Sequence, residues 1–520
     1  MSLRSALGEL IRSLPNDVIE IDGEVSIEYE ITAYAEMLSS TSPVLVFKNI
    51  KGYPSFRMVS NLFSSRSKIA LYLGVKEDRL NERWNSIINR RADYSIKRNS
   101  SSSRELTFTE EKADITSLPA PLHYLQDAGR YITSGIVVAR DLSGKLNLSF
   151  ARMQLLGPRL VAMSMHSRGH LWKYYQQYRQ QNKNLPISVI IGAHPIYYLL
   201  AAARVEDEYS KISGLIDDYL VEGITNDLPV PANAEIVIEG EISCSESFGE
   251  GPFTEYTGYL SNRSTNNLAR ISAISMRRDP IYLEINPSNS KEHILMSGMA
   301  KEPIVQSAVM NFLPSASSFS VQWPLKGVHY VAFAGIENAE PGIAKQLGLM
   351  LLGLDHYLKL VFVSEDSNPS GFYDFLSQLL CYHNIEIISD VFCNRLDPSA
   401  SPDGTSSKAI VITKGTGTSF RFREVEDGIN IYRCGKTLHI GRIASSSSEI
   451  NLLIDNDINP MDEEEVLWAV ATRLQPAGGI RTLKGNLVID AKRKGLNRPQ
   501  LPTSILEKVR RSLNKIEVHP

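Results

Sequence analysis

Seven short segments between residues 130 and 290 constrain the fold more than any other feature of this chain. Each alternates apolar and polar side chains or forms a brief apolar run, which is typical of β-strands. The segments are ITSGIVVAR, LNLSFARMQLL, RLVAMSM, ISVIIGAH, AEIVIEGEIS, ARISAISM and PIYLEIN. Strands at this density predict a twisted antiparallel sheet or small barrel with a few inserted helices, one of them over residues 171–183.

Helical and strand-like patterns alternate on both sides of this region. Apolar spacing predicts a helix over 3–14 and strands over 25–31 and 43–52, and the serine-rich, charged stretch 96–114 predicts a boundary or exposed loop. We therefore expect an α/β (α+β) protein. The expected parts are an N-terminal α/β domain (1–110), a central split-barrel-like domain (111–300), a linker helix region (301–325), a C-terminal α/β domain (326–495) and a C-terminal tail (496–520).

The C-terminal region also contains a faint internal similarity. Residues 394–413 and 472–490 share an Arg-Leu-x-Pro start, a glycine, a lysine and a terminal β-run. An old duplication and an ordinary α/β recurrence explain this similarity about equally well.

Composition excludes several classes of protein. The 55 Lys+Arg and 58 Asp+Glu residues nearly balance, so nucleic acid is not an expected partner. No run of 18 apolar residues occurs, and we expect neither a membrane span nor a signal peptide. The four cysteines are scattered without CxxC spacing, which argues against a zinc ribbon, a redox dithiol or a secreted disulfide framework. These features predict a cytoplasmic protein in a reducing compartment.

One set of polar residues in the middle of the chain suits a divalent metal ion. Asn147, His170 and Glu206 offer an amide oxygen, an imidazole nitrogen and a carboxylate, which suit Mn²⁺ or Mg²⁺ better than Zn²⁺. His170 is expected to open a helix after Arg168 and Gly169, and a helix N-terminus is a good place for phosphate. Each residue also has an ordinary reading as a turn asparagine, a helix-capping histidine or a solvated glutamate.

A second set suits proton transfer. Glu250 and Glu255 lie in SESFGEGPFTEYTGY, where glycines and a proline exclude a regular helix and predict a rigid loop. Loop carboxylates are usually only solvated, but burial in an apolar cleft would turn one of them into an acid near neutral pH. Arg152 could keep the other ionised or orient a substrate carboxylate. Asn147 and Arg152 are about 16 Å apart along a straight strand, so they could mark two ends of one elongated ligand.

Together these segments resemble the UbiD family of prenylated-FMN-dependent decarboxylases. The similarity runs through PVLVFKNIKG, NLSFAR, HSRGH, LPISVIIGAHP, TNDLPVPANAEIVIEGE, EGPFTEYTGY and NDINPMDEEEVLWAVATRLQP. The spacing of NDLPVPANAEIVIEGE and EGPFTE is the most specific part. This chain departs from the family pattern in two places, the ending VIDAKRKG and an expanded region over about 355–445. We therefore assign no oligomerisation residues from the resemblance.

The resemblance implies a cofactor and roles for both sets. Prenylated FMN would bind the central domain, its phosphate clamped through Mn²⁺ (or Mg²⁺) by Asn147, His170 and Glu206, with K⁺ close by. The other cofactor contacts implied are Phe150, Ala151, Arg152, Met163, Ser164, Met165, Arg168 and Gly169. Glu250, Arg152 and Glu255 would form the catalytic group, with Glu255 protonating a covalent cofactor–substrate adduct after loss of carbon dioxide.

The resemblance also implies partners, and some alternatives stay open. It implies a small carboxylic acid as substrate, a flavin prenyltransferase of the UbiX type as cofactor supplier and a homo-oligomer, dimer or hexamer, formed by the C-terminal domain. An ordinary FMN oxidoreductase and a non-catalytic assembly protein are the alternatives. Substrate-pocket residues are expected in 291–303, including His293, and in 326–335. Candidate substrates are aromatic, cinnamate-like and 4-hydroxybenzoate-type acids and anhydromevalonate phosphate.

Overall fold

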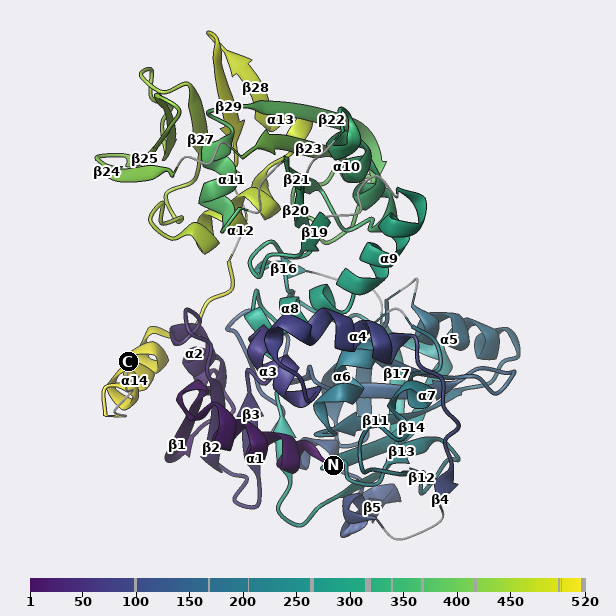
Figure 1. Ribbon diagram of the computed structural model, residues 1–520. Coiled ribbons are helices and arrows are strands. Elements are labelled where there is room, and N and C mark those ends of the chain that lie inside the picture. The colour runs from purple at the N-terminus through teal and green to yellow at the C-terminus, as the bar shows by residue number, and fades with distance from the viewer. Residues whose placement is uncertain are drawn as a thin grey trace. The chain divides into compact units, whose positions relative to one another are not determined.

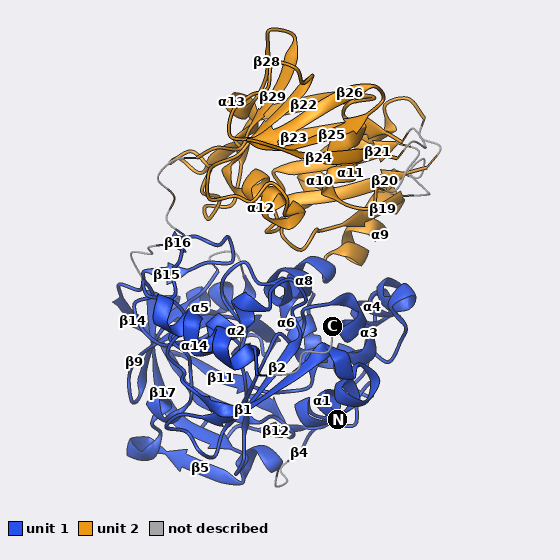
Figure 2. Cartoon of the chain, turned by 90° about the vertical axis from the view of Figure 1, so that its left-hand side faces the viewer, with its two compact units in different colours: residues 1–300, 498–520 blue, residues 301–497 orange. Residues whose placement is uncertain are grey.

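The computed structural model divides the chain into two compact units, residues 1–300 with 498–520 and residues 301–497 (Figure 2). The structure describes residues 1–97, 101–166, 169–203, 205–261, 266–313, 319–337, 340–365, 369–415, 419–493, 496 and 498–515. Within these ranges no helix is both long and apolar enough to cross a membrane. The finer division of the first unit near residue 110 stays a prediction.

The first unit begins with a four-stranded mixed sheet (Figure 1). Its order is β1 (Val18–Val25), β2 (Val44–Ile50), β3 (Arg57–Ser60) and β18 (Ile281–Leu283). Four helices accompany it: α1 (Leu3–Ser13), α2 (Glu30–Met37), α3 (Arg66–Tyr72) and α4 (Leu80–Ile88). The predictions of a helix over 3–14 and a strand over 43–52 are confirmed.

The strand predicted over residues 25–31 is wrong. The strand instead covers Val18–Val25, and Tyr29 adopts a left-handed conformation with φ 67° immediately before α2. The alternation of apolar residues in this segment reflects two elements that bury side chains on either side of a turn. Periodicity alone does not separate these two arrangements.

A nine-stranded antiparallel sheet forms the centre of the first unit. Its hydrogen-bonded path is β6-β9-β10-β17-β14-β11-β7-β8, and β5 pairs with β17. The strands are β5 (Leu106–Thr109), β6 (Tyr131–Ile132), β7 (Ile136–Arg140), β8 (Leu146–Phe150), β9 (Arg152–Gly157), β10 (Leu160–Ser164), β11 (Leu185–Ile191), β14 (Ile236–Phe248) and β17 (Asn266–Met276). Every pairing is antiparallel, as the sequence predicts.

The path of this sheet curls back on itself. β8 lies at one end of the path and β9 next to the other end, yet only Ala151 separates them along the chain. The two edge regions must therefore approach each other, as in an incompletely closed barrel. At Gly240 the register between β14 and β17 shifts, and a Cβ there would lie 2.2 Å from the Arg270 carbonyl oxygen, so this bend requires glycine.

Shorter elements surround the curled sheet. The helices are α5 (His170–Gln180), α6 (Pro195–Ala202), α7 (Glu208–Ile212) and α8 (Lys291–Met299), and α5 confirms the helix predicted over 171–183. A three-stranded sheet contains β13 (Pro229–Pro231), β12 (Leu220–Glu222) and β4 (Ile96–Lys97). β15 (Phe253–Thr254) and β16 (Leu260–Ser261) form a two-stranded hairpin.

The second unit contains two sheets with the same pattern of pairing. The first has the order β19 (Phe319–Gln322), β20 (Val331–Ile336), β21 (Leu360–Glu365), β23 (Thr405–Lys414), β22 (His383–Phe392). The second has the order β24 (Arg421–Val425), β25 (Gly428–Arg433), β26 (Lys436–Gly441), β27 (Ile450–Leu453), β29 (Asn486–Asp490), β28 (Ile480–Leu483). Across β19–β22 and across β25–β28 the pairings run antiparallel, parallel, parallel, antiparallel. This shared topology favours duplication as the origin of the internal similarity.

Helices and one disulfide complete the second unit. The helices are α9 (Glu302–Phe312), α10 (Ile343–Leu354), α11 (Phe372–Gln378), α12 (Glu463–Arg473) and α13 (Pro476–Gly479). α10 packs its leucines onto the first sheet, and a Cβ at Gly348 would lie 2.4 Å from Ile410. Cys381 and Cys434 form a disulfide across a sequence separation of 53 residues, which the scattered cysteine pattern did not predict. This bond runs against the expectation of a reducing compartment.

The C-terminal segment belongs to the first unit. The helix α14 (Thr503–Leu513) lies against α2, where the Tyr34 hydroxyl donates to Ser512 Oγ at 2.7 Å (Figure 1). Before α14, the Leu125 amide donates to the Gln500 carbonyl oxygen at 3.0 Å. A backbone hydrogen bond and helix packing thus tie both halves of this segment to the N-terminal part of the chain.

Candidate functional site

The structure brings Arg152, Glu250 and Glu255 together. Arg152 is the first residue of β9, Glu250 lies in the loop after β14, and Glu255 follows β15. Arg152 donates from Nε to Glu250 Oε1 at 2.6 Å and from Nη2 to Oε2 at 3.0 Å, and it donates from Nη1 to Glu255 Oε1. Ser261 Oγ also donates to Glu255 Oε1, at 2.6 Å. Residues about 100 positions apart in sequence therefore share one buried cluster.

This cluster is largely removed from solvent. The side chains of Arg152, Glu250 and Glu255 are 12%, 0% and 8% exposed. Burial lowers the pKa of Arg152, but Glu255 and Glu250 outweigh it, and the pKa lies well above its ordinary value. The guanidinium thus stays charged between two carboxylates, an arrangement that can hold an anion and a proton at the same place.

The Arg152 guanidinium packs on the aromatic ring of Phe253, which in turn packs on Tyr131. The Arg152 guanidinium carbon lies 4.3 Å from the centroid of the Phe253 ring. The Tyr131 ring packs on Phe253 with centroids 4.5 Å apart. A cation held over a ring face in a desolvated place gains electrostatic stabilisation, so these rings fix the plane of the guanidinium.

Asn147 and His170 also approach each other, on β8 and at the first turn of α5. Asn147 Nδ2 lies 3.4 Å from His170 Nδ1, and Gly169 is the N-cap of α5, which confirms that His170 opens this helix. Ser149 Oγ donates to Asn147 Oδ1 at 2.5 Å. Burial, followed by the neighbouring Lys173, lowers the pKa of His170, which favours the neutral imidazole that binds metals.

The acid that contacts Asn147 directly is Glu208, while Glu206 interacts with His170 through its charge. Asn147 Nδ2 donates to Glu208 Oε1 at 2.7 Å, whereas the Glu206 side chain is 67% exposed and pairs with Lys145 at 2.8 Å. Asp207 between them is left-handed, with φ 55°, so the two glutamates point in different directions. The geometry therefore favours Glu208 over the predicted Glu206 as the third residue of this set.

Glu208 is suited to a cation. It is 2% exposed, and burial raises its pKa to about 8. Its partners are amides, and within the described ranges no lysine or arginine pairs with it. A divalent ion would supply the positive charge that this buried carboxylate lacks. Among the described residues, no group of three or more His, Cys, Asp or Glu side chains is placed to hold a metal ion; this set has two such side chains and an asparagine.

The other predicted cofactor contacts lie near these two clusters. Phe150 and Ala151 join β8 to β9, and Ser164 pairs with Arg152 in the register of β10 and β9. Met163 and Met165 are buried around Ser164. Arg168 lies outside the described residues. The two polar clusters thus lie at the two ends of the β8–β9 connection.

His293 is a half-buried polar residue near the acid–base cluster, and its Nδ1 atom is buried. It lies on α8, its ring is 5.6 Å from that of Tyr256, and Nδ1 has no hydrogen-bond partner among the described residues. Burial lowers the pKa of His293 and Glu255 partly offsets this. An unpaired buried nitrogen is costly, which is expected where a ligand supplies the missing partner.

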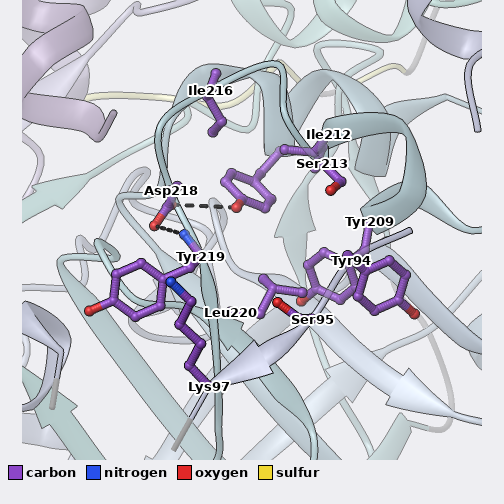
Figure 3. Close-up of a pocket in the computed structure, with 11 residues that line it drawn as sticks. Tyr94, Ser95, Lys97, Tyr209, Ile212, Ser213, Ile216, Asp218, Tyr219 and Leu220 are labelled. Carbon is purple, nitrogen blue, oxygen red and sulfur yellow. Dashed lines mark hydrogen bonds between the residues drawn. The ribbon is translucent and has the colours of Figure 1, made fainter. Parts of the chain in front are cut away.

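A separate cavity of about 180 Å³ lies beside α7 (Figure 3). Tyr209 and Ile212 of α7 line it, whereas Glu208 at the start of the same helix faces Asn147. Asp218 in its wall accepts from the Tyr219 amide at 2.8 Å and from the Tyr197 hydroxyl at 3.4 Å (Figure 3). Neither polar cluster lines this cavity.

Three family models match the chain in order. The N-terminal, Rift-related and C-terminal domains of 3-octaprenyl-4-hydroxybenzoate carboxy-lyase match residues 14–88, 95–290 and 304–412. The fold and the matched domains define the class of protein as a carboxy-lyase. The chain belongs to the UbiD family of decarboxylases.

Individual relatives cover most of the chain. Anhydromevalonate phosphate decarboxylase from Methanosarcina mazei is 28% identical, over 78% of this chain and 94% of the relative. Phenolic acid decarboxylase from Bacillus subtilis is 26% identical, over 76% and 88%. The UbiD-class enzyme HmfF from Pelotomaculum thermopropionicum, solved with FMN, is 28% identical with a TM-score of 0.74, over 82% of this chain and 98% of that chain. An evolved dimeric form of HmfF was solved with prFMN.

Proposed function

We propose that this protein catalyses the reversible, non-oxidative decarboxylation of an aromatic or α,β-unsaturated carboxylic acid with prenylated FMN. The observation that carries the proposal is the buried Glu250–Arg152–Glu255 cluster in a chain of the UbiD family. In such a cluster the arginine can bind a substrate carboxylate while one of the two carboxyl groups delivers a proton, within one small volume.

Each residue of the cluster has one role in the proposal. Arg152 binds the substrate carboxylate and orients it. Glu250 holds the guanidinium through two hydrogen bonds, and Glu255 delivers a proton to the carbon that loses carbon dioxide. No side chain can accept the electron pair that departing carbon dioxide leaves behind, and prenylated FMN, when bound, supplies this electron sink.

The cofactor end of the site uses the other cluster. Asn147, His170 and Glu208 would hold Mn²⁺ or Mg²⁺, which in turn would bind the cofactor phosphate, with K⁺ close by. Amide oxygen, imidazole and carboxylate suit such a hard ion. To bind the ion, the side-chain amide of Asn147 would rotate so that its oxygen faces the ion. The positions of the amide oxygen and nitrogen depend on their hydrogen-bond partners, and a bound ion would be such a partner.

The remaining parts of the proposal concern substrate and partners. Anhydromevalonate phosphate and phenolic acids are the substrates named for the relatives, and cinnamate-like and 4-hydroxybenzoate-type acids extend the set to be tested. His293 is the residue that we expect to shape the choice among them. A flavin prenyltransferase would supply the cofactor, and we expect a cytoplasmic homo-oligomer, a dimer or a hexamer.

Cofactor identity and turnover together test this proposal. The protein would be produced with a flavin prenyltransferase and Mn²⁺, its released cofactor weighed by mass spectrometry, and carbon dioxide measured with each candidate acid. We expect prenylated FMN, turnover of one class of acid, and a Glu255→Gln variant that binds the cofactor but releases no carbon dioxide. Ordinary FMN with redox activity would instead support an oxidoreductase, and wild-type turnover by Glu255→Gln would refute the role of Glu255.

A further inference from the structure

The hairpin that carries Glu255 is too short to fix it alone. β15 and β16 pair through Phe253 with Ser261 and Thr254 with Leu260, and in the described part of the chain neither strand pairs with any other. A two-stranded hairpin is marginally stable at best in water, even when longer than this. The position of Glu255 beside Arg152 therefore depends on contacts from outside the hairpin.

Asp127 provides such a contact. Its Oδ1 accepts from the Thr254 amide at 2.8 Å and from Thr254 Oγ1 at 3.0 Å, while Oδ2 accepts from the Tyr124 amide at 3.1 Å. Asp127 is 8% exposed and Thr254 is fully buried. One carboxylate thus joins the loop after Tyr124 to the residue immediately before Glu255.

Residues next to Asp127 also contact Pro252 and Phe253, which directly precede Thr254. The Ala128 amide donates to the Pro252 carbonyl oxygen at 2.8 Å. The Tyr131 ring packs on Phe253, which also contacts the Arg152 guanidinium. The segment 127–131 therefore contacts Pro252, Phe253 and Thr254, the three residues that directly precede Glu255.

The bonding pattern at Asp127 is ordinarily a local one. Asp114 accepts from the amide and hydroxyl of Thr116, at 2.8 and 2.6 Å, and Asp403 accepts in the same way from Thr405, at 2.9 and 2.8 Å. Both of these pairs cap a turn across two residues. At Asp127 the same pattern spans 127 residues and is buried, and burial raises the pKa of this carboxyl group. Burying a carboxylate is costly, so a long-range tie of this kind indicates a demand for precise placement.

We propose that Asp127 is a positioning residue that fixes the hairpin β15–β16 and so holds Glu255 at the Arg152 guanidinium. This inference rests on the proposed function for its catalytic consequence. Asp127 touches neither substrate nor cofactor in this account, because it acts through Thr254. Misplacing a reacting group by about 1 Å can cost roughly 100-fold in rate, which sets the scale of the expected effect.

The kinetic test compares two substitutions of Asp127 with a matched control. Asp127→Ala should lower kcat by about 100-fold and leave KM close to wild type, because Arg152 keeps its two bonds to Glu250. Asp127→Asn keeps an oxygen that can accept from Thr254 but places its NH₂ group against the Tyr124 N–H, so only the second bond is lost. This variant should therefore recover most of the kcat that Asp127→Ala loses. Asp114→Ala removes the same kind of bonds elsewhere and should leave kcat unchanged.

Hydrogen–deuterium exchange gives a second readout that needs no substrate. In Asp127→Ala, the amides of residues 253–261 should exchange faster than in wild type, whereas Asp114→Ala should leave this segment unchanged. If wild-type protein releases no carbon dioxide from any acid, the proposed function fails and exchange alone decides whether Asp127 holds the hairpin. Unchanged exchange in Asp127→Ala, unchanged kcat in an active enzyme, a rise in KM alone, or an equal loss in Asp114→Ala would each overturn the inference.

Discussion

The guanidinium of Arg152 meets the carboxylate of Glu250 through two parallel hydrogen bonds, Nε to Oε1 at 2.6 Å and Nη2 to Oε2 at 3.0 Å. This fork geometry fixes the guanidinium in its own plane and directs the remaining nitrogen, Nη1, to Glu255. Glu250 therefore determines the direction in which Arg152 presents its charge.

Arg152→Lys tests this directional role. Lysine keeps the charge but is a point donor that cannot form the fork and reach Glu255 together. We expect kcat/KM to fall by at least about 100-fold, with flavin absorbance retained, since the loss concerns orientation at the reacting centre. Steady-state kinetics and absorbance spectra of the same preparation measure both. A lysine variant with nearly wild-type kinetics would show that charge alone suffices.

Glu208→Ala and Glu206→Ala distinguish the buried acid from its exposed neighbour. Glu208 contacts Asn147 and is buried, whereas Glu206 pairs with Lys145 at the surface. We expect Glu208→Ala and His170→Ala to purify without bound metal and flavin, and Glu206→Ala to retain both. Metal content by elemental analysis and flavin absorbance are the measurements. Retention by Glu208→Ala together with loss in Glu206→Ala would restore the assignment made from the sequence.

The contact of Glu208 with Asn147 shows what sequence patterns leave undecided. The segment VEDEYS offers three acids within three positions, and the left-handed backbone of Asp207 decides which one turns inward. That conformation is unusual for a residue other than glycine, and nothing in the residue types announces it. The sequence offers only one weak signal, a largely apolar Tyr209 directly after Glu208, and the structure buries that tyrosine.

The strand-rich central sheet, in contrast, was predictable because its pattern is contained in the residue types themselves. Alternation with a period of two fixes which side chains face the core, so the antiparallel sheet followed from the residues themselves. The bonds of Asp127 and the disulfide of Cys381 did not follow, because each joins segments far apart in sequence. Arg152, Glu250 and Glu255 were grouped by the acid–base chemistry of their side chains and by the family resemblance, and their contact is a result of the fold.

Glu292 should make stability depend on pH. It is completely buried on α8, and burial, with Glu284 nearby, raises its pKa from 4.5 to about 8. The unfolded chain releases the Glu292 proton near pH 4.5, whereas the folded chain keeps it until about pH 8. The contribution of Glu292 to the free energy of unfolding is therefore fully present below pH 4.5 and is lost as the pH rises to 8. The decrease should be on the order of a few kcal/mol.

Denaturant unfolding at several pH values measures this contribution. Glu292→Gln keeps an acceptor for the Asn61 amide and should flatten the dependence between pH 4.5 and 8, whereas Glu24→Gln at an exposed position of β1 should not. An unchanged pH dependence in Glu292→Gln would show that this group does not retain its proton in the folded state.

The Cys381–Cys434 disulfide should stabilise the second unit. It closes a loop with a sequence separation of 53 residues, and disulfides of this kind contribute about 2–4 kcal/mol. Cys381→Ser, or reductant added to wild type, should lower the free energy of unfolding by this amount. Cys244→Ser, at a free cysteine, serves as the control. Two thiols in the unreduced, denatured wild type are expected, and four would show that the bond does not form.

The central claim is that Glu255 delivers a solvent-derived proton to the carbon that loses carbon dioxide. Turnover of the acid found by screening should therefore be run in D₂O and the product examined by mass spectrometry and NMR. The account predicts one deuterium, located at the carbon that carried the carboxyl group, and no product from Glu255→Gln. Product without deuterium at that carbon, or the same labelled product at wild-type rate from Glu255→Gln, would contradict it.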